Sequence, residues 1–303
     1  MSSLSRLVVV GGLGVCAAAS AWAQAQITAL VNAATFQSGL PKGGSLATIF
    51  CSGLTSGVKP GTYLAPSSSP LPYALGGLSV TINTGMAPML AVVIDSSGNA
   101  QINFQVPLEA TGQYAPSIEA CGTAAPAGQF DYGGFFADAN GYAIAQHASD
   151  YSLVTPQNPA HPGEAIVAYA DDFFPVWPPP PIGIPVPPQP LFQVLPPSVA
   201  SSNYFVGGPN AYLYLQTYPQ PVCIIGNGCT NTYTDTPALQ VTFEGLAPGM
   251  VGVEQINFVV PANQQPGNWA LFFNVGSCPS GTGAPGSCGL SGESSPYAIL
   301  PVD

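Results

Sequence analysis

The sequence predicts an all-β fold of two tandem antiparallel β-sandwich modules. Nearly the same seven residues occur twice, as QINFQVP at 101–107 and QINFVVP at 255–261, and turn-forming residues separate short apolar runs throughout. Of the 303 residues, 35 are glycine and 34 are proline, whereas only 6% are charged. This composition favours short strands joined by turns over long helices that are laced with salt bridges.

The first 23 residues are expected to be a secretory signal peptide. Arg6 precedes an apolar run that ends in AWA at 21–23, a pattern that signal peptidase accepts. Lipidation at Cys16 is the alternative, and the bulky residue before it disfavours this. No later stretch holds the roughly 18 uninterrupted apolar residues of a membrane span. We therefore expect no transmembrane segment after signal removal, and a secreted, periplasmic or cell-surface protein.

The small number of basic residues limits the classes of partner that the chain can bind. Removal of the signal leaves Lys42 and Lys59 as the basic residues, against 14 acidic residues. Nucleic acids and anionic lipid surfaces are bound through clustered Lys and Arg. The sequence therefore predicts no nucleic-acid partner.

Further segments recur in the same order as the heptapeptide and predict a duplicated module. The pairs are GSLATIF (44–50) with GEAIVAY (163–169), VTIN (80–83) with VTFE (241–244), and LVNAATF (30–36) with LVTPQNP (153–159). We place the boundary near Asp150, which gives a first module at 24–150 and a second module at 151–303.

The pattern of the heptapeptide predicts a β-strand. Ile102, Phe104 and Val106 fall on one face by strict alternation, and proline ends both copies because it cannot donate to a sheet ladder. Burial does not explain the amides repeated on the other face, at Gln101, Asn103, Gln255 and Asn257. We expect these amides to hydrogen-bond neighbouring backbone.

The second module carries a proline-rich insertion at about 173–198, which includes FFPVWPPPPIGIPVPPQP at 173–190. Such a segment is too rich in proline for a central strand and predicts a polyproline-like loop. A stiff spacer or a lid over a sheet face is the favoured interpretation, and a recognition element is the alternative.

Six cysteines follow the signal segment, and an even number in an exported chain indicates disulfides. Spacing favours three pairs, namely Cys51–Cys121, Cys223–Cys229 and Cys278–Cys288. A zinc site is disfavoured because the chain has no C-x-x-C.

The chain resembles the Solibacter-type uncharacterised C-terminal domain family of exported acidobacterial proteins. The resemblance lies in LVNAATFQSG (30–39), GGSLATIFCSGL (43–54), LGGLSVTIN (75–83), QINFQVPLEATG (101–112), HPGEAIVAYADDF (161–173), ALQVTFEGLAPGMVGVEQINFVVPA (238–262) and SSPYAILPV (294–302). It implies immunoglobulin-like β-sandwich modules and export, and no established activity, cofactor or catalytic residue. The chain departs from the family at Asp171-Asp172-Phe173-Phe174, where a small Gly-containing turn followed by proline is usual.

Those two carboxylates are the candidate metal ligands. Side by side on an extended chain they would point to opposite faces, but in a tight turn both could reach one calcium ion. A solvated acidic turn is the alternative. No other cofactor is expected.

Hydrolytic chemistry has little support, because the chain holds only two histidines, His147 and His161. No G-x-S-x-G elbow accompanies them. Both are expected to be exposed loop residues, and no catalytic residue is assigned.

An aromatic row is the candidate ligand site. In AYLYLQTY at 211–218, Leu213 and Leu215 would face the core while Tyr212 and Tyr214 face outward, and Trp177 precedes them in the insertion. Outward tyrosines stack on sugar rings or anchor a protein partner. Packing beneath the prolines is the alternative.

The sequence thus predicts an exported, non-enzymatic structural or adhesive protein with a protein or glycan partner at the cell surface. A carbohydrate-binding module is the second candidate, and an unrecognised hydrolase is the third.

Overall fold

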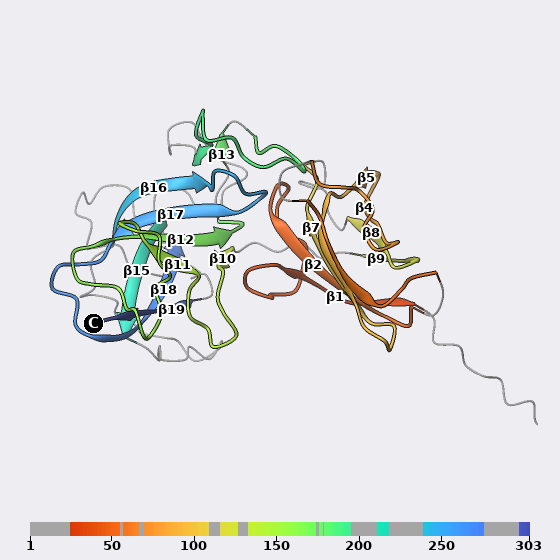
Figure 1. The fold of residues 1–303 in the computed structure, drawn as a ribbon. Coiled ribbons are helices and arrows are strands. Elements are labelled where there is room, and N and C mark those ends of the chain that lie inside the picture. Colours follow the sequence, from red (N-terminus) through yellow and green to blue (C-terminus); the bar gives the residue numbers. More distant parts are fainter. Residues whose placement is uncertain are drawn as a thin grey trace, which may run out of the picture.

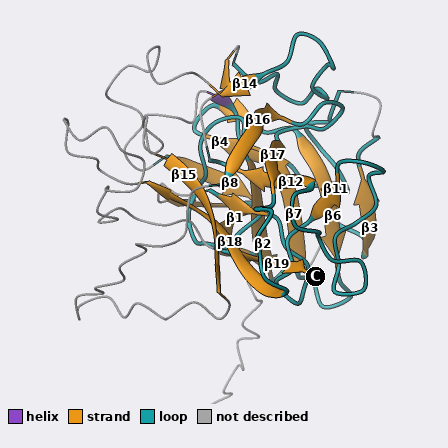
Figure 2. Cartoon of the chain, turned by 90° about the vertical axis from the view of Figure 1, so that its left-hand side faces the viewer, coloured by secondary structure: helices purple, strands orange, loops and turns teal. Residues whose placement is uncertain are grey.

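The structure is a computed structural model. It describes residues 25–54, 57–66, 70–108, 116–126, 133–173, 176–177, 179–194, 211–217, 239–275 and 297–303. Its regular structure is all-β, and Figure 2 shows strands joined by long loops. Within these ranges we find no helix with the length and apolarity that a membrane crossing requires.

The first module consists of two antiparallel sheets. A five-stranded sheet has the order β1 (Gln26–Asn32), β2 (Leu46–Ser52), β7 (Ala100–Gln105), β6 (Met89–Ile94) and β3 (Gly61–Leu64). A four-stranded sheet has the order β5 (Gly85–Met86), β4 (Val80–Ile82), β8 (Ser117–Ala120) and β9 (Thr123–Pro126). Buried side chains from both sheets meet in one core, in which Ile49, Ile102 and Phe104 are 0% exposed.

The second module repeats this plan with a larger first sheet. That sheet has the order β10 (Gly134–Phe135), β12 (Ala165–Asp171), β17 (Glu254–Val259), β16 (Gln240–Leu246), β14 (Gln193–Val194) and β13 (Val176–Trp177), and β11 (Ala145–His147) also pairs with β12. A three-stranded sheet has the order β15 (Ala211–Thr217), β18 (Gly267–Val275) and β19 (Ala298–Val302). Figure 1 shows the two modules side by side.

The modules divide earlier in the chain than the boundary expected near Asp150. β10 and β11 pair with β12, and Phe135 and Ala145 belong to the second core. The division therefore lies between Pro126, where β9 ends, and Gly134, where β10 begins.

The duplicated heptapeptide forms the central strand of each larger sheet. β7 lies between β2 and β6, and β17 lies between β12 and β16. Ile102, Phe104, Ile256 and Phe258 are all 0% exposed, so the predicted apolar face is the buried one. GSLATIF and GEAIVAY also correspond, because they supply β2 and β12.

The pairing of VTIN with VTFE is wrong. VTIN supplies β4 in the smaller sheet of the first module, whereas VTFE lies within β16, beside β17. The true counterpart of β16 is β6. Each carries a bulge at the same step of its partner strand, between Met89 and Ala91 in β6 and between Val241 and Phe243 in β16. Pairing register, which the sequence pattern does not show, decides this correspondence.

The repeated amides bond to each other and not to backbone. Gln101 Nε2 donates to Asn103 Oδ1 at 3.1 Å, and Gln255 Nε2 donates to Asn257 Oδ1 at 2.9 Å. Thr48 Oγ1 also donates to Asn103 Oδ1, at 3.1 Å. Because residues i and i+2 of a strand share a face, the Gln-x-Asn spacing brings the two amides together. A hydrogen-bond partner within the protein is found for these amides, as expected. The partner is a side chain, whereas backbone was expected.

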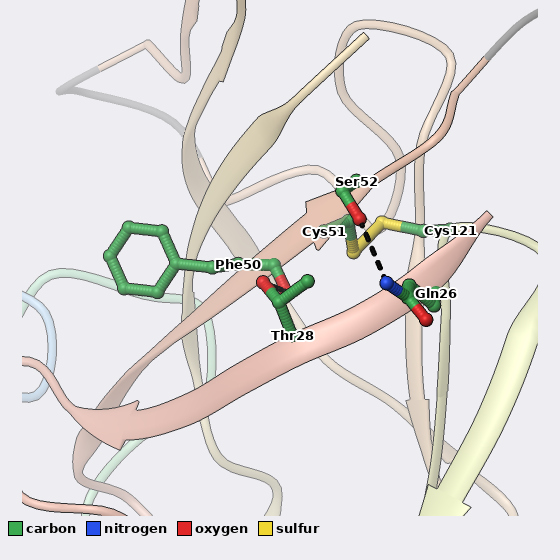
Figure 3. Close-up of a disulfide and its surroundings, with 6 residues drawn as sticks. All are labelled: Gln26, Thr28, Phe50, Cys51, Ser52 and Cys121. Atoms are coloured by element: carbon green, nitrogen blue, oxygen red, sulfur yellow. Dashed lines mark hydrogen bonds between the residues drawn. A yellow bond between two sulfur atoms is a disulfide. The ribbon is translucent and has the colours of Figure 1, made fainter. Parts of the chain in front are cut away.

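The first module is cross-linked by a disulfide between Cys51 and Cys121, as the spacing predicts. Cys51 lies on β2 beside the edge strand β1, where Gln26 Nε2 donates to Ser52 Oγ at 3.4 Å (Figure 3). Cys121 lies in the turn after β8, so the bond joins the two sheets. Cys223, Cys229, Cys278 and Cys288 lie outside the described residues.

Candidate functional site

Asp171 and Asp172 lie at the junction between the modules and not in a solvated turn. They are 0% and 2% exposed. Asp171 Oδ1 accepts the backbone N–H of Leu46 at 2.9 Å. Asp172 Oδ1 accepts the backbone N–H of Lys42 and the hydroxyl of Ser45, each at 3.2 Å. Both carboxylates of the second module therefore bind the loop at 42–46 of the first.

The backbone at the end of β12 explains how consecutive side chains reach one loop. Asp172 has φ 61°, in the left-handed region that aspartate tolerates better than most residues. This turn breaks the strict alternation of the strand, which would otherwise send the two carboxylates to opposite faces. The expected solvated acidic turn is therefore wrong, because both carboxylates are buried against groups of the other module.

Charge at the junction is only partly balanced. Lys42 Nζ lies 3.7 Å from Asp172 Oδ1, and the lysine side chain is 29% exposed. Burial raises the pKa of Asp171 well above its usual range, and the charge of Asp172 raises it further. Burial also raises the pKa of Asp172, against the opposing effect of Lys42. A third carboxylate, Glu254, is 5% exposed and accepts the backbone N–H of Phe173 at 3.1 Å through Oε2.

One oxygen of each aspartate, Oδ2 of Asp171 and of Asp172, is buried without a hydrogen-bond partner. An unpaired buried oxygen costs more for an ionised carboxylate than for a carboxyl group that carries a proton. In the part of the chain that the structure describes, no group of three His, Cys, Asp or Glu side chains is placed to hold a metal ion. Calcium binding by this pair remains an expectation from sequence.

The proline-rich insertion docks on the first module through Gln105. This side chain is 0% exposed. Its Nε2 donates to Gly44 O at 2.8 Å and to Pro181 O at 3.3 Å, and its Oε1 accepts the N–H of Gly183 at 2.7 Å. Leu71 N–H then donates to Gly183 O at 2.6 Å. We call residues 179–186 the strap, and Figure 1 shows this part of the chain reaching the first module near β7.

Two glycines allow the close approach of the modules. A Cβ atom at Gly252 would lie 2.7 Å from Leu46 Cδ2 and 2.9 Å from Gly44 O, and the residue has φ +68°. At Gly44, whose φ is +95°, a Cβ atom would lie 2.5 Å from Pro180 Cγ. A side chain at either position would therefore push the modules or the strap apart.

The aromatic row lies on β15, as expected. Leu213 and Leu215 are 1% and 0% exposed, which confirms that they face the core. Trp177 ends β13, and the side chains of Trp177, Tyr212 and Tyr214 lie outside the described part.

The two histidines come together, which the sequence did not predict. His161 is exposed as expected, but His147 lies in β11 and is only 5% exposed. Their ring centroids are 6.1 Å apart. Glu164 bridges them, since Oε1 lies 3.0 Å from His147 Nδ1 and accepts the backbone N–H of His161 at 2.7 Å. A hydrogen bond from the His161 ring to the carboxylate of Asp303 raises the pKa of His161. This cluster ties β11 to the C-terminal end of the second module.

Sequence reasoning missed Gln105, although a signal was present. QINFQVP and QINFVVP differ at one position, where Gln105 corresponds to Val259. The polar residues that the two copies share, Gln101 with Gln255 and Asn103 with Asn257, hydrogen-bond to each other within their own copy. The single difference marks the residue that binds the other module.

Comparison with known proteins adds no relative. The chain matches no model of a protein family, and a search of curated proteins finds nothing similar to it.

Proposed function

We propose that this chain is an exported, non-enzymatic protein with a structural or adhesive role at the cell surface or in the extracellular space. In this proposal its two modules are immunoglobulin-like β-sandwiches, and the chain belongs with the acidobacterial family that its segments resemble. A signal peptide at 1–23 directs its export. The Cys51–Cys121 bond is compatible with an oxidising compartment.

The observation that carries the proposal is the closed junction between the modules. Modules within one chain move relative to each other unless their interface is extensive and well packed. Here Asp171, Asp172 and Gln105 bind across the interface while they are almost fully buried. Such a junction holds the two modules at a fixed spacing, which suits an adhesive or load-bearing element.

Export and attachment are tested separately. The full-length chain, expressed in a Gram-negative host, should yield a product in the periplasm or medium whose N-terminus is Gln24. Beads coated with this product should attach to the surface of the producing bacterium, and beads coated with the Gly252→Ala variant, whose junction is forced open, should attach less. An uncleaved cytoplasmic product would refute export. Beads that do not attach would refute the adhesive role.

A carbohydrate-binding role is the second candidate function. The observation that favours it is a surface groove of about 380 Å³ on the second module, which several polar and apolar side chains line.

A further inference from the structure

The groove lies between two turns of the second module. One wall is the turn at 138–142, the other is the hairpin at 153–157, and residues 143–144 lie between them. Its volume of about 380 Å³ is at the lower end of the range of roughly 300–1,000 Å³ for small-molecule sites. None of the junction residues lines it, so its role is separate from holding the modules together.

A fixed carboxylate stands at one wall. Asp138 Oδ1 accepts the backbone N–H groups of Asn140 at 2.8 Å and Tyr142 at 2.9 Å, which leaves Oδ2 out of both bonds. The N–H of Tyr142 lowers the pKa of Asp138, so the carboxylate is ionised at neutral pH. The exposed residues Asn140 and Gln157 add carboxamides that donate and accept. The groove therefore offers hydrogen-bond acceptors and donors in one place.

Apolar side chains share the groove. Ile144 is 37% exposed and Leu153 is 55% exposed, although both are large hydrophobic residues. The half-buried Tyr142 lies beside them, and its hydroxyl accepts from Asn268 Nδ2 at 3.5 Å. Tyr151, which is 67% exposed, lies two residues before Leu153. A sugar ring combines apolar C–H faces with hydroxyl edges, and a wall of this mixed kind complements both.

The hairpin wall is fixed before any ligand binds. Thr155 and Asn158 exchange two backbone hydrogen bonds, at 2.9 and 3.0 Å, and Val154 N–H donates to Ala145 O at 2.9 Å. His147, which is buried, lies 3.3 Å from Asn158 O through Nε2. A preformed site loses less conformational entropy on binding, which favours affinity for a small ligand.

The charge of the residues that line the groove determines which sugars it can bind. The groove contains one carboxylate, that of Asp138, and no Lys, Arg or His among the residues that line it. Phosphorylated, sulfated and acidic sugars would meet repulsion with no compensating cation. We propose that this groove binds a neutral saccharide, whose hydroxyl groups bond to Asp138 and Gln157 while its ring packs on Ile144 and Leu153. This names the ligand class of the proposed carbohydrate-binding role, on which it rests.

A glycan array, followed by titration calorimetry with the best neutral glycan, tests the proposal. Asp138→Asn keeps the Oδ1 acceptor of the turn and replaces Oδ2 by a donor, and Gln157→Ala removes the second amide. We expect each variant to stay folded and to weaken binding about tenfold or more, the effect of one lost ligand hydrogen bond. Tyr73→Ser, at a residue of the first module that is 48% exposed, is the control and should bind as the wild type.

Three results would overturn this assignment: no neutral glycan bound, a preference for anionic glycans, or full binding by both groove variants. If Tyr212→Ala or Tyr214→Ala abolished binding and the groove variants did not, the site would lie on β15, and carbohydrate binding itself would stand. Bead attachment in the absence of any glycan binding would instead assign adhesion to a protein partner.

Discussion

The side-chain oxygen of Gln105 accepts the backbone N–H of Gly183 at 2.7 Å, across 78 positions of sequence. The same amide donates to Gly44 O, so one buried side chain joins the first module, the loop at 42–46 and the strap. The second copy of the heptapeptide has Val259 at this position, and valine has no side-chain group that could make these hydrogen bonds.

Gln105→Val should destabilise the protein by about 1–3 kcal/mol, because Gly183 N–H and Gly44 O would be left without their partner inside the interface. The measurement is the midpoint of unfolding in guanidinium chloride. Gln101→Val is the matched control, since it is the same substitution on the outer face of the same strand. Equal destabilisation by Gln105→Val and Gln101→Val would contradict this account.

Gly252→Ala should cost more stability than Gly249→Ala. Both glycines have positive φ, +68° and +80°, so both variants share the cost of a left-handed alanine, about 1–2 kcal/mol. Only at Gly252 would the new Cβ atom meet Leu46 and Gly44 O, whereas at Gly249 nothing lies within 4 Å. We expect an excess of about 1–3 kcal/mol, together with a larger radius of gyration in small-angle scattering. Equal values would show that the contact between the modules is not formed in solution.

Acidification from pH 8 to pH 5 should stabilise the protein. Asp171 and Asp172 have raised pKa values, and burial raises the pKa of Glu244 to about 7. An acid of this kind holds its proton more tightly when folded, so its cost is absent below the unfolded pKa of about 4 and grows as pH rises toward the folded pKa. The melting temperature should therefore rise on acidification. Asp171→Asn should raise it at pH 8 and flatten the slope.

Three other titratable groups also contribute to the dependence of stability on pH. The raised pKa of His161 acts in the same direction, since its stabilising charge is lost as pH rises, and His161→Gln separates its share. Asp95 and Asp150 have pKa values that hydrogen bonds lower, so the stability they give is lost below about pH 4. A melting temperature that falls steadily from pH 8 to pH 5 would contradict the buried junction.

Loss of the Cys51–Cys121 bond should destabilise the first module by about 4 kcal/mol, because the bond closes a loop that spans 70 positions. The Cys51→Ala/Cys121→Ala variant is compared with the wild type by calorimetry, with and without reductant. The reductant should lower the first-module transition of the wild type and leave that of the variant in place. A wild-type transition that does not respond would mean that this bond contributes little.

The calcium expectation can also be settled. Both aspartates already bond to the first module through one oxygen, so we expect millimolar calcium or a chelator to leave the melting temperature unchanged. A shift that Asp172→Asn abolishes would restore calcium at the junction.

Several features followed from the sequence alone, because they depend on local rules. The alternation of QINF and its terminal proline predict a strand with one buried face, and Ile102, Phe104, Ile256 and Phe258 are buried accordingly. Cysteine spacing predicts the Cys51–Cys121 pair. The alternation of a strand and the effect of its terminal proline depend on a few neighbouring residues, and the disulfide prediction depends on the number and spacing of the cysteines. All three can therefore be seen in a single sequence.

Only the tertiary structure decided the rest. The roles of Asp171, Asp172 and Gln105 depend on a loop 125, 130 and 61 positions away, at Leu46, Lys42 and Gly44. The correspondence of β6 with β16 depends on a bulge in the pairing register, and the burial of His147 depends on β12. Burial and register are properties of how distant segments meet. The sequence around Asp171 and Asp172 is typical of a solvated turn, but the contact between the two modules buries both carboxylates.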